Sequence, residues 1–395
     1  MDYKLLSEVS VYRKDRIRSD KVNKENYIST ENILPNRGGV ESATTVASAK
    51  TFPAYKKGDI LLSNIRPYFK KIWYADKEGG CSNDVLVVKA GKSVDSKFLY
   101  YVLSDNNFFN YSTVTSKGTK MPRGSKNAIM KYWVPDLDLP TQKKVADILS
   151  SYDELIKANN ERIELLEQVA QELYKEWFVR FRFPGYENAK FEDGIPEGWE
   201  IKRIVDLFDI TSSKRVYLAD YVDAGIPFYR SKEIIQLSQG QAITEPLYIS
   251  NAAYENFKSK YGAPEKNDIL ITSVGTIGVS YLVDGHEFYF KDGNLTWIKS
   301  GSNKALSLFL FQWLNSQSGK QQLLQSTIGT SQSALTIENL KKIKLLVPTK
   351  ALIEDYYQKA HFMLEQKSAL QMNNRNLAVQ RDMLLPRLMS GKLEV

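Results

Sequence analysis

The chain has 395 residues, of which 43 % are hydrophobic and 25 % charged, a composition typical of a folded protein of two or three domains. Its single cysteine, Cys81, excludes an internal disulfide, so we expect a protein of the reducing cytoplasm, and its two histidines disfavour a zinc site or a Cys–His nucleophile pair. No run of 18 apolar residues occurs and the charged N-terminus has no apolar core, so we expect neither a membrane span nor a signal peptide.

The net charge of +8 comes mainly from one segment. Residues 1–135 carry 23 Lys and Arg against 13 Asp and Glu, whereas residues 136–185 carry 7 against 10, residues 186–348 carry 17 against 18, and residues 349–395 carry 7 against 5. A basic globule is typical of a protein that binds a polyanion, most simply nucleic acid. A surface charge that serves only solubility is the alternative.

Residues 1–135 are predicted to form a mixed α/β domain. Short apolar runs between turns indicate strands, and an apolar pattern with helical spacing indicates a helix. In chain order, the predicted elements are a short helix or strand over residues 5–9, strands over 59–63 and 84–88, a helix over 97–103 and a basic, glycine-containing loop over 116–124.

A long helix is predicted over residues 140–181. The segment contains no glycine, and no proline after its first residue, and Pro184 with Gly185 is a stop signal. At 1.5 Å per residue the helix would be about 60 Å long. Apolar side chains recur at helical spacing on either side of a polar break at Asn159 and Asn160. They are Val145, Ile148, Tyr152, Leu155, Ile163, Leu166, Ala170, Leu173 and Trp177.

A second long helix is predicted over residues 349–389. Its apolar side chains lie on one heptad stripe, at Ile353, Tyr356, Ala360, Met363, Leu370, Leu377, Leu384 and Leu388. Lys367, Asn374 and Arg381 interrupt the stripe, and polar residues at core positions lower stability but define register and partner choice. Because neither helix can bury its stripe alone, we predict that the two form an antiparallel coiled coil. Two amphipathic helices packed on separate globules are the alternative.

The second globule repeats the first. Residues 56–63 align with 265–272, 98–103 with 309–314, 139–141 with 347–349, and Gly118 with Gly329, at an offset of about 210. The order is therefore globule, long helix, globule, long helix. We predict an α+β (mixed α/β) protein with a pseudo-two-fold internal repeat, in which similar domains over 1–135 and 186–347 are separated by long helices over 136–185 and 348–395.

Two similar domains at a fixed separation suit a DNA target with two half-sites and unread base pairs between them, because B-DNA presents the same face about every 34 Å. The two domains differ in sequence, so the two half-sites are expected to differ. This predicts a bipartite, asymmetric target in double-stranded DNA.

Several motifs give the chain a resemblance to a known family. They are YISTENILP at 27–35, TQKKVADILSS at 141–151, EQVAQELYKEWF at 167–178, IPEGW at 195–199, IPFYRSKEI at 226–234 and RDMLLPRLMSG at 381–391. In this order, and together with the duplication, they resemble the specificity subunit of type I restriction–modification systems over essentially the whole chain.

The resemblance implies two target recognition domains, a central and a distal conserved helix, and no catalysis by this chain. It also implies a complex with two modification subunits, which are adenine methyltransferases, and with two translocating nuclease subunits for restriction. S-adenosylmethionine would then belong to the methyltransferase, and ATP and Mg to the nuclease, with no cofactor in this chain. The sequence contains no Asn-Pro-Pro-Tyr-like tetrapeptide, no Gly-rich cofactor loop and no P-loop.

Residues that contact DNA are expected on loops, with Lys and Arg on phosphates and polar side chains on base edges. In the first domain the candidates are Asn64, Arg66 and Tyr68 after a strand, and Lys117, Thr119, Lys120 and Arg123 on the glycine-containing loop. In the second domain they are Ser273, Thr276, Thr330, Ser331 and Gln332, with Lys214, Arg215 and Arg230 as phosphate contacts. A solvated loop position is the alternative for each residue.

Large side chains near the ends of the two helices are the candidates for docking the modification subunits, because aromatic and Arg residues are favoured as interface anchors. They are Tyr174, Trp177, Phe178, Phe181, Arg381, Leu385, Arg387 and Met389. Packing onto the adjacent domain, or between the helices, is the alternative.

Two other functions are consistent with parts of the pattern. A stand-alone bipartite DNA-binding protein, such as a repressor or an orphan specificity subunit, would not co-purify with a methyltransferase. A self-sufficient nuclease would cleave DNA with a metal ion and no partner. The carboxylates of Asp136 and Glu200 could suggest such a nuclease, but the long helix separates them in the sequence, so they are not expected to meet.

Overall fold

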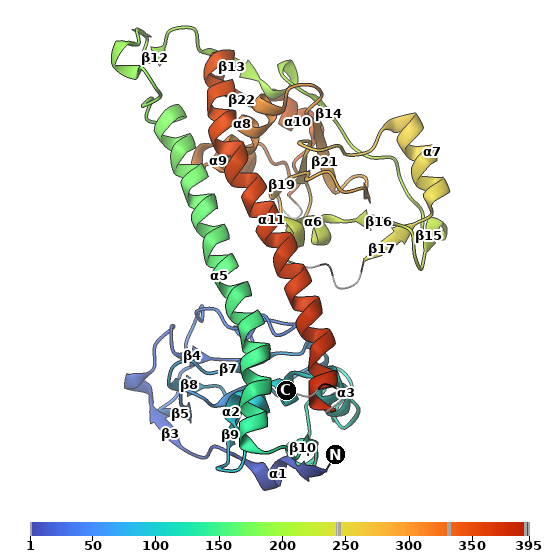
Figure 1. The fold of residues 1–395 in the computed structure, drawn as a ribbon. Helices are drawn as coiled ribbons and strands as arrows, with labels where there is room; N and C mark the ends of the chain where they lie inside the picture. Colours follow the sequence, from blue (N-terminus) through green and yellow to red (C-terminus); the bar gives the residue numbers. More distant parts are fainter. Residues whose placement is uncertain (1, 242, 244–245, 330–332, 391–392, 394–395) are drawn as a thin grey trace. The chain divides into compact units, whose positions relative to one another are not determined.

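The computed structural model describes residues 2–241, 243, 246–329, 333–390 and 393 (Figure 1). Unit 1 combines Met1–Lys157 with Asn376–Val395, and unit 2 is Ala158–Arg375. Each unit contains a mixed α/β globule and part of the two long helices α5 (Leu139–Phe178) and α11 (Lys350–Met389), which have 40 residues each. Among the described residues, no helix is long and apolar enough to cross a membrane.

The main sheet of unit 1 is buried on both faces. It has four antiparallel strands in the order β2 (Ser10–Tyr12), β9 (Val85–Ala90), β6 (Ile60–Ser63) and β7 (Ile72–Tyr74). Alternate residues of β6 enter different cores: Ile60 and Leu62 pack with the helices, and Leu61 packs with a second sheet. An uninterrupted apolar run is typical of a strand that is covered on both sides.

A smaller sheet and several helices complete the globule of unit 1. The smaller sheet has the order β3 (Arg16–Arg18), β5 (Thr51–Tyr55), β8 (Gly79–Cys81) and β4 (Tyr27–Ile28). The other elements are β1 (Tyr3–Leu5), which pairs with β10 (Trp133–Pro135), and α1 (Leu6–Val9), α2 (Ser96–Ser104), α3 (Asn106–Val114), α4 (Lys126–Ile129), η1 (Ser19–Lys21) and η2 (Pro67–Phe69). Asp95 and Asp105 cap α2 and α3 by accepting hydrogen bonds from backbone N–H groups, which defines where each helix begins.

The main sheet of unit 2 has the order β14 (Asp209–Thr211), β21 (Leu295–Lys299), β18 (Ile269–Thr272) and β19 (Ser280–Leu282). Its smaller sheet has the order β15 (Tyr221–Val222), β17 (Leu247–Ile249), β16 (Ile226–Tyr229) and β20 (Tyr289–Phe290). Two strand pairs are separate from these sheets: β11 (Phe191–Glu192) with β12 (Ile195–Pro196), and β13 (Glu200–Arg203) with β22 (Lys344–Val347). The helices are α6 (Ser231–Ser238), α7 (Asn251–Tyr261), α8 (Lys304–Asn315), α9 (Gln317–Gln325), α10 (Ile337–Lys342), η3 (Tyr186–Asn188), η4 (Ile204–Asp206) and η5 (Leu218–Asp220).

The two globules repeat the same main sheet, which confirms the predicted internal repeat. By chain order, β2, β9, β6 and β7 of unit 1 correspond to β14, β21, β18 and β19 of unit 2, and the strands lie in the same spatial order in both sheets. The smaller sheets differ, because β5 pairs with β8 in unit 1 whereas its counterpart β17 pairs with β16 in unit 2. The duplicated framework therefore carries divergent outer parts.

The predicted antiparallel pairing of the long helices is present in both units. Each polar residue that interrupts the stripe of α11 has a partner on α5: Arg381 with Asp153 in unit 1, and Lys367 with Glu167 and Asn374 with Asn159 in unit 2. Within unit 2 the residue numbers rise along α5 while those of their partners on α11 fall, so the helices are antiparallel. The polar interruptions match across the pair, which is how buried polar residues define a register.

Two details of the helix predictions are wrong. Leu155, predicted on the buried stripe of the first helix, is 46 % exposed. A straight helix has 3.6 residues per turn, so a strict heptad stripe rotates away from the partner, and Ala146 and Leu149 are buried instead. The helix also ends at Phe178 rather than at residue 181, because Phe181 has a left-handed backbone conformation with φ of +57°.

A buried aspartate organises the turn before the central strand of each main sheet. In unit 1, Asp59 accepts hydrogen bonds from Arg13 at 2.6 and 2.9 Å. In unit 2, Asp268 is 3 % exposed and accepts from the indole Nε1 of Trp297 at 2.8 Å and from the backbone and hydroxyl of Ser300 at 2.7 and 3.0 Å. The two carboxylates occupy equivalent places in the repeat and join β6 and β18 to neighbouring segments.

Asp268→Ala is expected to destabilise unit 2 by about 3 kcal/mol, because it leaves the backbone N–H groups of Ser300 and Glu265, together with an indole and a hydroxyl, without their acceptor. Asp268→Asn retains one acceptor oxygen and should lose less. Denaturant unfolding followed by tryptophan fluorescence measures both losses. Equal stability of the Ala variant and the wild type would show that the carboxylate does not support the turn.

Candidate nucleic-acid interface

In unit 1 the basic loop that the sequence predicts to contact DNA is a turn closed by its own backbone. Lys117 and Arg123 each donate their N–H to the other's carbonyl oxygen, both at 2.9 Å. Gly118 has a φ of +94°, a conformation that favours glycine. The side chains of Lys117, Thr119, Lys120 and Arg123 are exposed, so the turn presents three cations on a defined frame.

The second group of candidates, which follows β6, lies against this turn. Ile65 forms a β-bridge with Arg123, and the N–H of Arg66 donates to the carbonyl oxygen of Pro122 at 2.8 Å. Tyr68 is 46 % exposed. The structure therefore brings together two candidate groups that are distant in the sequence.

Asn64 supports this arrangement from below the surface. It is 8 % exposed, its carbonyl oxygen accepts a hydrogen bond from the N–H of Gly124 at 3.0 Å, and its side-chain oxygen has no hydrogen-bond partner among the described residues. A Cβ at position 124 would lie 2.9 Å from that oxygen, so the close approach requires glycine. Asn64 therefore packs beneath the turn and does not present its amide to solvent.

The cations around the turn are available to an anionic ligand. Arg123 lies 3.2 Å from Asp84, but both side chains are largely solvated, so this pair contributes little. Lys117 and Lys120 have no ion-pair partner in the described part of the chain. The guanidinium carbon of Arg66 lies 6.0 Å from the centroid of the Phe69 ring. Together these groups form a positive surface on unit 1.

Unit 2 contains the same backbone arrangement with different residues. We call this arrangement the frame: a turn closed by two backbone hydrogen bonds and joined by a third to the segment that follows the central strand of the main sheet. Ile328 and Ala334 exchange two backbone hydrogen bonds of 2.9 Å, Gly329 has a φ of +95°, and the N–H of Leu335 donates to the carbonyl oxygen of Ser273 at 2.9 Å. These residues follow Lys117, Arg123, Gly118, Gly124 and Asn64 of unit 1 by about 210 positions. The backbone of the candidate site is therefore duplicated along with the sheet.

The side chains on the second frame have a different character. Residues 327–335 contain neither Lys nor Arg. The candidates Thr330, Ser331 and Gln332 lie outside the described residues. Thr276 is exposed, whereas Ser273 is 4 % exposed and its hydroxyl shares a hydrogen bond of 2.7 Å with that of Thr296. Ser273 therefore supports the frame, as Asn64 does in unit 1.

The turn around Asn294 brings the basic candidates of unit 2 close to this frame. The carbonyl oxygen of Asn294 accepts a hydrogen bond from the N–H of Ser273 at 2.9 Å. In the same turn, Asp292 accepts from the Nε of Arg215 at 3.2 Å. Lys214 is exposed beside Arg215. These two cations therefore lie on the side of unit 2 that carries the duplicated frame.

Arg230 is held by a buried carboxylate. Its guanidinium donates to both oxygens of Glu233, at 2.6 and 3.0 Å, and Glu233 is 1 % exposed. Burial acts to raise the pKa of Glu233, but the hydrogen bonds from Arg230 outweigh it and hold that pKa below its usual range. The next residue, Ser231, donates its hydroxyl to the carbonyl oxygen of Asn294 at 3.2 Å, which places Arg230 at the same turn.

The aromatic residues predicted to dock another subunit are part of a core in this chain. Tyr174, Trp177 and Phe178 are buried in unit 2 against Tyr356 of α11, and Phe181 packs against the same core. This is the packing that the sequence left open as the alternative. A contact between these residues and another subunit stays a prediction.

The candidates on α11 divide in the same way. Leu385 and Met389 are buried in unit 1, and Arg387 is exposed. Arg381 pairs with Asp153, and although burial acts to lower the pKa of Arg381, the neighbouring carboxylates raise it overall. Within unit 1, then, Arg387 alone of these four presents its side chain to solvent.

Sequence reasoning missed two pairs of exposed apolar residues on the long helices. The α5 pair is Leu165 and Val169 in unit 2, which are 60 % and 51 % exposed. The α11 pair is Val379 and Met383 in unit 1, which are 58 % and 60 % exposed. Residues four apart lie on one face of a helix, so each pair forms a continuous apolar patch. The sequence signal that could have identified these pairs is that their apolar residues lie outside the buried stripe predicted for each helix.

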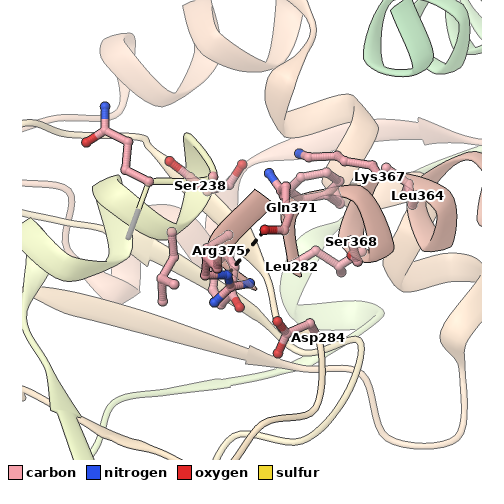
Figure 2. Close-up of a pocket in the computed structure, with 14 residues that line it drawn as sticks. Ser238, Leu282, Asp284, Leu364, Lys367, Ser368, Gln371 and Arg375 are labelled. Carbon is pink, nitrogen blue, oxygen red and sulfur yellow. Dashed lines mark hydrogen bonds between the residues drawn. The ribbon is translucent and has the colours of Figure 1, made fainter. Parts of the chain in front are cut away.

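Unit 2 also contains a polar cavity of about 70 Å³, which Figure 2 shows in close-up. Gln371 and Arg375 of α11 line it together with Tyr281 and Asp284. The hydroxyl of Tyr281 is buried and has no partner among the described residues. A cavity of this volume is large enough for water molecules and too small for a nucleotide. The described residues also contain no group of three His, Cys, Asp or Glu placed to hold a metal ion.

A family model matches the chain twice. The family is described as type I restriction modification DNA specificity domain, and the matches cover residues 6–168 and 196–362. Each match includes one globule and the first part of the long helix that follows it, up to residue 168 in α5 and residue 362 in α11, in agreement with the repeat.

Curated relatives match over most of the chain. The type I restriction enzyme MjaIX specificity subunit of Methanocaldococcus jannaschii is 26 % identical over 373 residues, which cover 91 % of this chain and 82 % of the relative. The type I restriction enzyme HindI specificity subunit of Haemophilus influenzae is 22 % identical over 440 aligned positions, which cover 93 % of this chain and 94 % of the relative. Among solved structures, the S subunit of the type I restriction–modification system from M. genitalium has the same fold, with a TM-score of 0.57 and 16 % identity. The match covers 98 % of this chain and 95 % of that subunit.

Proposed function

Because this chain belongs to the type I restriction modification DNA specificity domain family, we propose that it binds a bipartite, asymmetric target in double-stranded DNA and positions adenine methyltransferase subunits on that target. The chain is a specificity subunit and not an enzyme. It supplies the DNA sequence specificity of a type I restriction–modification complex, and the chemistry belongs to partner subunits.

The observation that carries the proposal is the duplicated frame with unlike side chains. One frame closes between Lys117 and Arg123 and the other between Ile328 and Ala334. Because the two frames have the same backbone conformation, we expect each of them to contact one half-site. Unequal side chains support half-sites of different sequence, because base-edge contacts depend on side-chain chemistry.

The charges on the two frames support different modes of contact. The frame of unit 1 carries Lys117, Lys120 and Arg123, which suit phosphate contacts that fix the position of the duplex. The corresponding loop of unit 2 is uncharged, and Lys214 and Arg215 supply cations from a neighbouring segment. We therefore expect the first half-site to be bound with the steeper salt dependence.

The recognition domains are proposed to comprise residues 1–135 and 186–347, with the helical segments 136–185 and 348–395 as the central and distal helices. Their supporting observation is the position of the helices, since α5 begins at Leu139 and α11 at Lys350. An exchange of residues 186–347 should therefore change the recognition of one half-site and leave that of the other unchanged.

The partners are proposed to be two modification subunits, joined by two translocating nuclease subunits when the complex restricts DNA. Two similar apolar patches, the α5 pair and the α11 pair, support two copies of one partner, because each unit offers one patch of the same kind. S-adenosylmethionine would bind to the modification subunit, and ATP and Mg to the nuclease subunit. We propose a cytoplasmic location for the complex, since a DNA target in the chromosome would lie there.

Reconstitution tests the proposed function. The full chain is mixed with the modification subunit of its host, and the methylated positions on a plasmid library are mapped with and without the chain. Methylation confined to one two-part sequence, and dependent on the chain, is the expected result. Failure of the two proteins to associate, together with sequence-specific DNA binding by the chain alone, would instead support a stand-alone DNA-binding protein.

A further inference from the structure

An unusual backbone conformation is concentrated beside the basic loop of unit 1. Seven non-glycine residues among those described have a positive φ, and four of them lie in two adjacent segments. They are Asn36, Arg37, Arg66 and Lys70, with φ between +51° and +61°. The N–H groups of Asn36 and Arg37 donate to the carbonyl oxygens of Phe69 and Lys70 at 2.8 and 3.0 Å, which joins the segments. A left-handed backbone conformation is strained for a residue other than glycine, and clusters of such residues are typical of places where the structure holds a functional group in position.

The group held here is an aromatic pair on the short turn η2. Pro67 is buried and anchors the turn, whereas Tyr68 is 46 % exposed and Phe69 is 39 % exposed. Their ring centroids are 4.8 Å apart, so the two rings form one projecting apolar unit. Arg66 and Lys70, both with left-handed backbone, bracket the turn and fix its direction.

The surroundings of the pair select an anionic partner with flat apolar surfaces. The guanidinium of Arg66 lies over the Phe69 ring, and its Nε is buried without a hydrogen-bond partner among the described residues. The β-bridge from Ile65 to Arg123 places the cations of the basic loop beside the turn. Stacked base pairs flanked by phosphates have both properties, whereas a neutral protein surface lacks the negative charge.

We propose that Tyr68 and Phe69 form a wedge that enters the DNA groove at the half-site bound by unit 1 and unstacks one base step. The inference rests on the proposed function and adds to it a mode of recognition. Apolar side chains inserted at a base step kink the duplex, and the step that kinks most easily is favoured. The wedge therefore contributes sequence preference through the deformability of DNA.

Unit 2 does not repeat the wedge. The segment that follows β18 reads Ser-Val-Gly-Thr-Ile-Gly over residues 273–278 and contains no aromatic residue. The equivalent segment after β6 contains the aromatic pair. Only one of the two half-sites should therefore be kinked by this mechanism, which gives the proposal an internal control.

DNA bending measured by fluorescence transfer tests the wedge. The full chain, in its complex with modification subunits, is bound to two duplexes of the methylation-mapped target, with a dye pair flanking either the first or the second half-site. A kink of about 20–90° that depends on Phe69 is expected at the first half-site and not at the second. Phe69→Ala and Tyr68→Ala should each weaken binding roughly tenfold. Trp133→Ala is the matched control, because it removes an aromatic residue of unit 1 that is 59 % exposed on β10. It should neither abolish the kink nor weaken binding.

The possible results separate the wedge from the proposed function. Sequence-specific binding by the wild type with no Phe69-dependent kink, or with the same kink in Phe69→Ala, would overturn the wedge and leave the proposed function intact. A Phe69-dependent kink at the second half-site would overturn it as well. If the aromatic variants bound DNA normally but lost the modification subunits, the pair would be a protein contact. No sequence-specific binding by the wild-type complex would overturn the proposed function itself.

Discussion

Replacing Leu165 and Val169 together by Glu is expected to remove one of the two modification subunits from the complex, and replacing Val379 and Met383 by Glu to remove the other. Burial of two aliphatic side chains contributes about 3–6 kcal/mol to an interface, and an unpaired buried carboxylate adds a further cost. The affinity for each copy should therefore fall at least about 100-fold. Native mass spectrometry of the purified complex measures the number of subunits directly.

Ile201→Glu is the matched control, because Ile201 is 62 % exposed in unit 2 but lies on β13 and not on a long helix. It should leave two modification subunits in place. If both double variants still bound two modification subunits, the α5 and α11 pairs would not belong to the interface. The buried aromatic residues of the helix end would then be the next candidates, although they would have to leave a core to reach a partner.

Replacing Lys120 and Arg123 together by Ala is expected to weaken DNA binding at low salt by about 10- to 100-fold, because each removes a charged hydrogen bond to phosphate. The slope of log affinity against log salt should become shallower by about 1.8, since each neutralised phosphate contributes about 0.9. Fluorescence anisotropy over a series of salt concentrations measures both quantities. The loss should be similar for all sequences, because phosphate contacts carry no base information.

A double variant with the same charge change tests whether position matters. Lys77→Ala/Lys92→Ala removes two exposed cations from unit 1 that follow the far ends of β7 and β9, at Tyr74 and Ala90. The candidate site lies at the other end of the sheet, where β6 ends at Ser63. The control should change affinity only slightly. Equal losses in the two variants would mean that net charge, and not the basic loop, drives binding.

The long helices were predictable because their signals are local. Apolar residues at three- and four-residue spacing, and the absence of glycine, define α5 and α11 to within a few residues. The exposure of Leu155 was not predictable from a heptad template, since a straight helix does not keep a strict seven-residue repeat. The polar positions of the second helix predicted a paired register, and each of them has a partner on the first.

The candidate site was predictable in its loops but not in its construction. Alignment of the two halves located Gly118 and Gly329, whose positive φ values agree to within a degree, and the glycine pattern is a local signal. The β-bridge from Ile65 to Arg123 is a tertiary contact without a sequence signal. For the same reason, the burial of Asn64 and Ser273 could not be foreseen, because a polar residue after a strand is equally common in solvent and beneath a turn.

The aromatic residues of the helix ends illustrate a second limit. A buried aromatic cluster and an interface anchor have the same composition, so the sequence could not decide between a core and a docking site for Trp177 and Phe178. The strained segments beside η2 show a third. Asn36, Arg37, Arg66 and Lys70 are not glycine, and their left-handed conformation depends on hydrogen bonds between segments.

Base-resolved mapping of N6-methyladenine in the host genome tests the bipartite specificity role most directly, with the gene present, deleted, or altered by exchange of residues 186–347 for those of another family member. We expect a gap-separated, asymmetric two-part motif that disappears on deletion, and a change in one half of that motif, with the other half retained, on exchange. A methylation pattern that is the same in all three strains, or an exchange that alters both halves, would contradict that role.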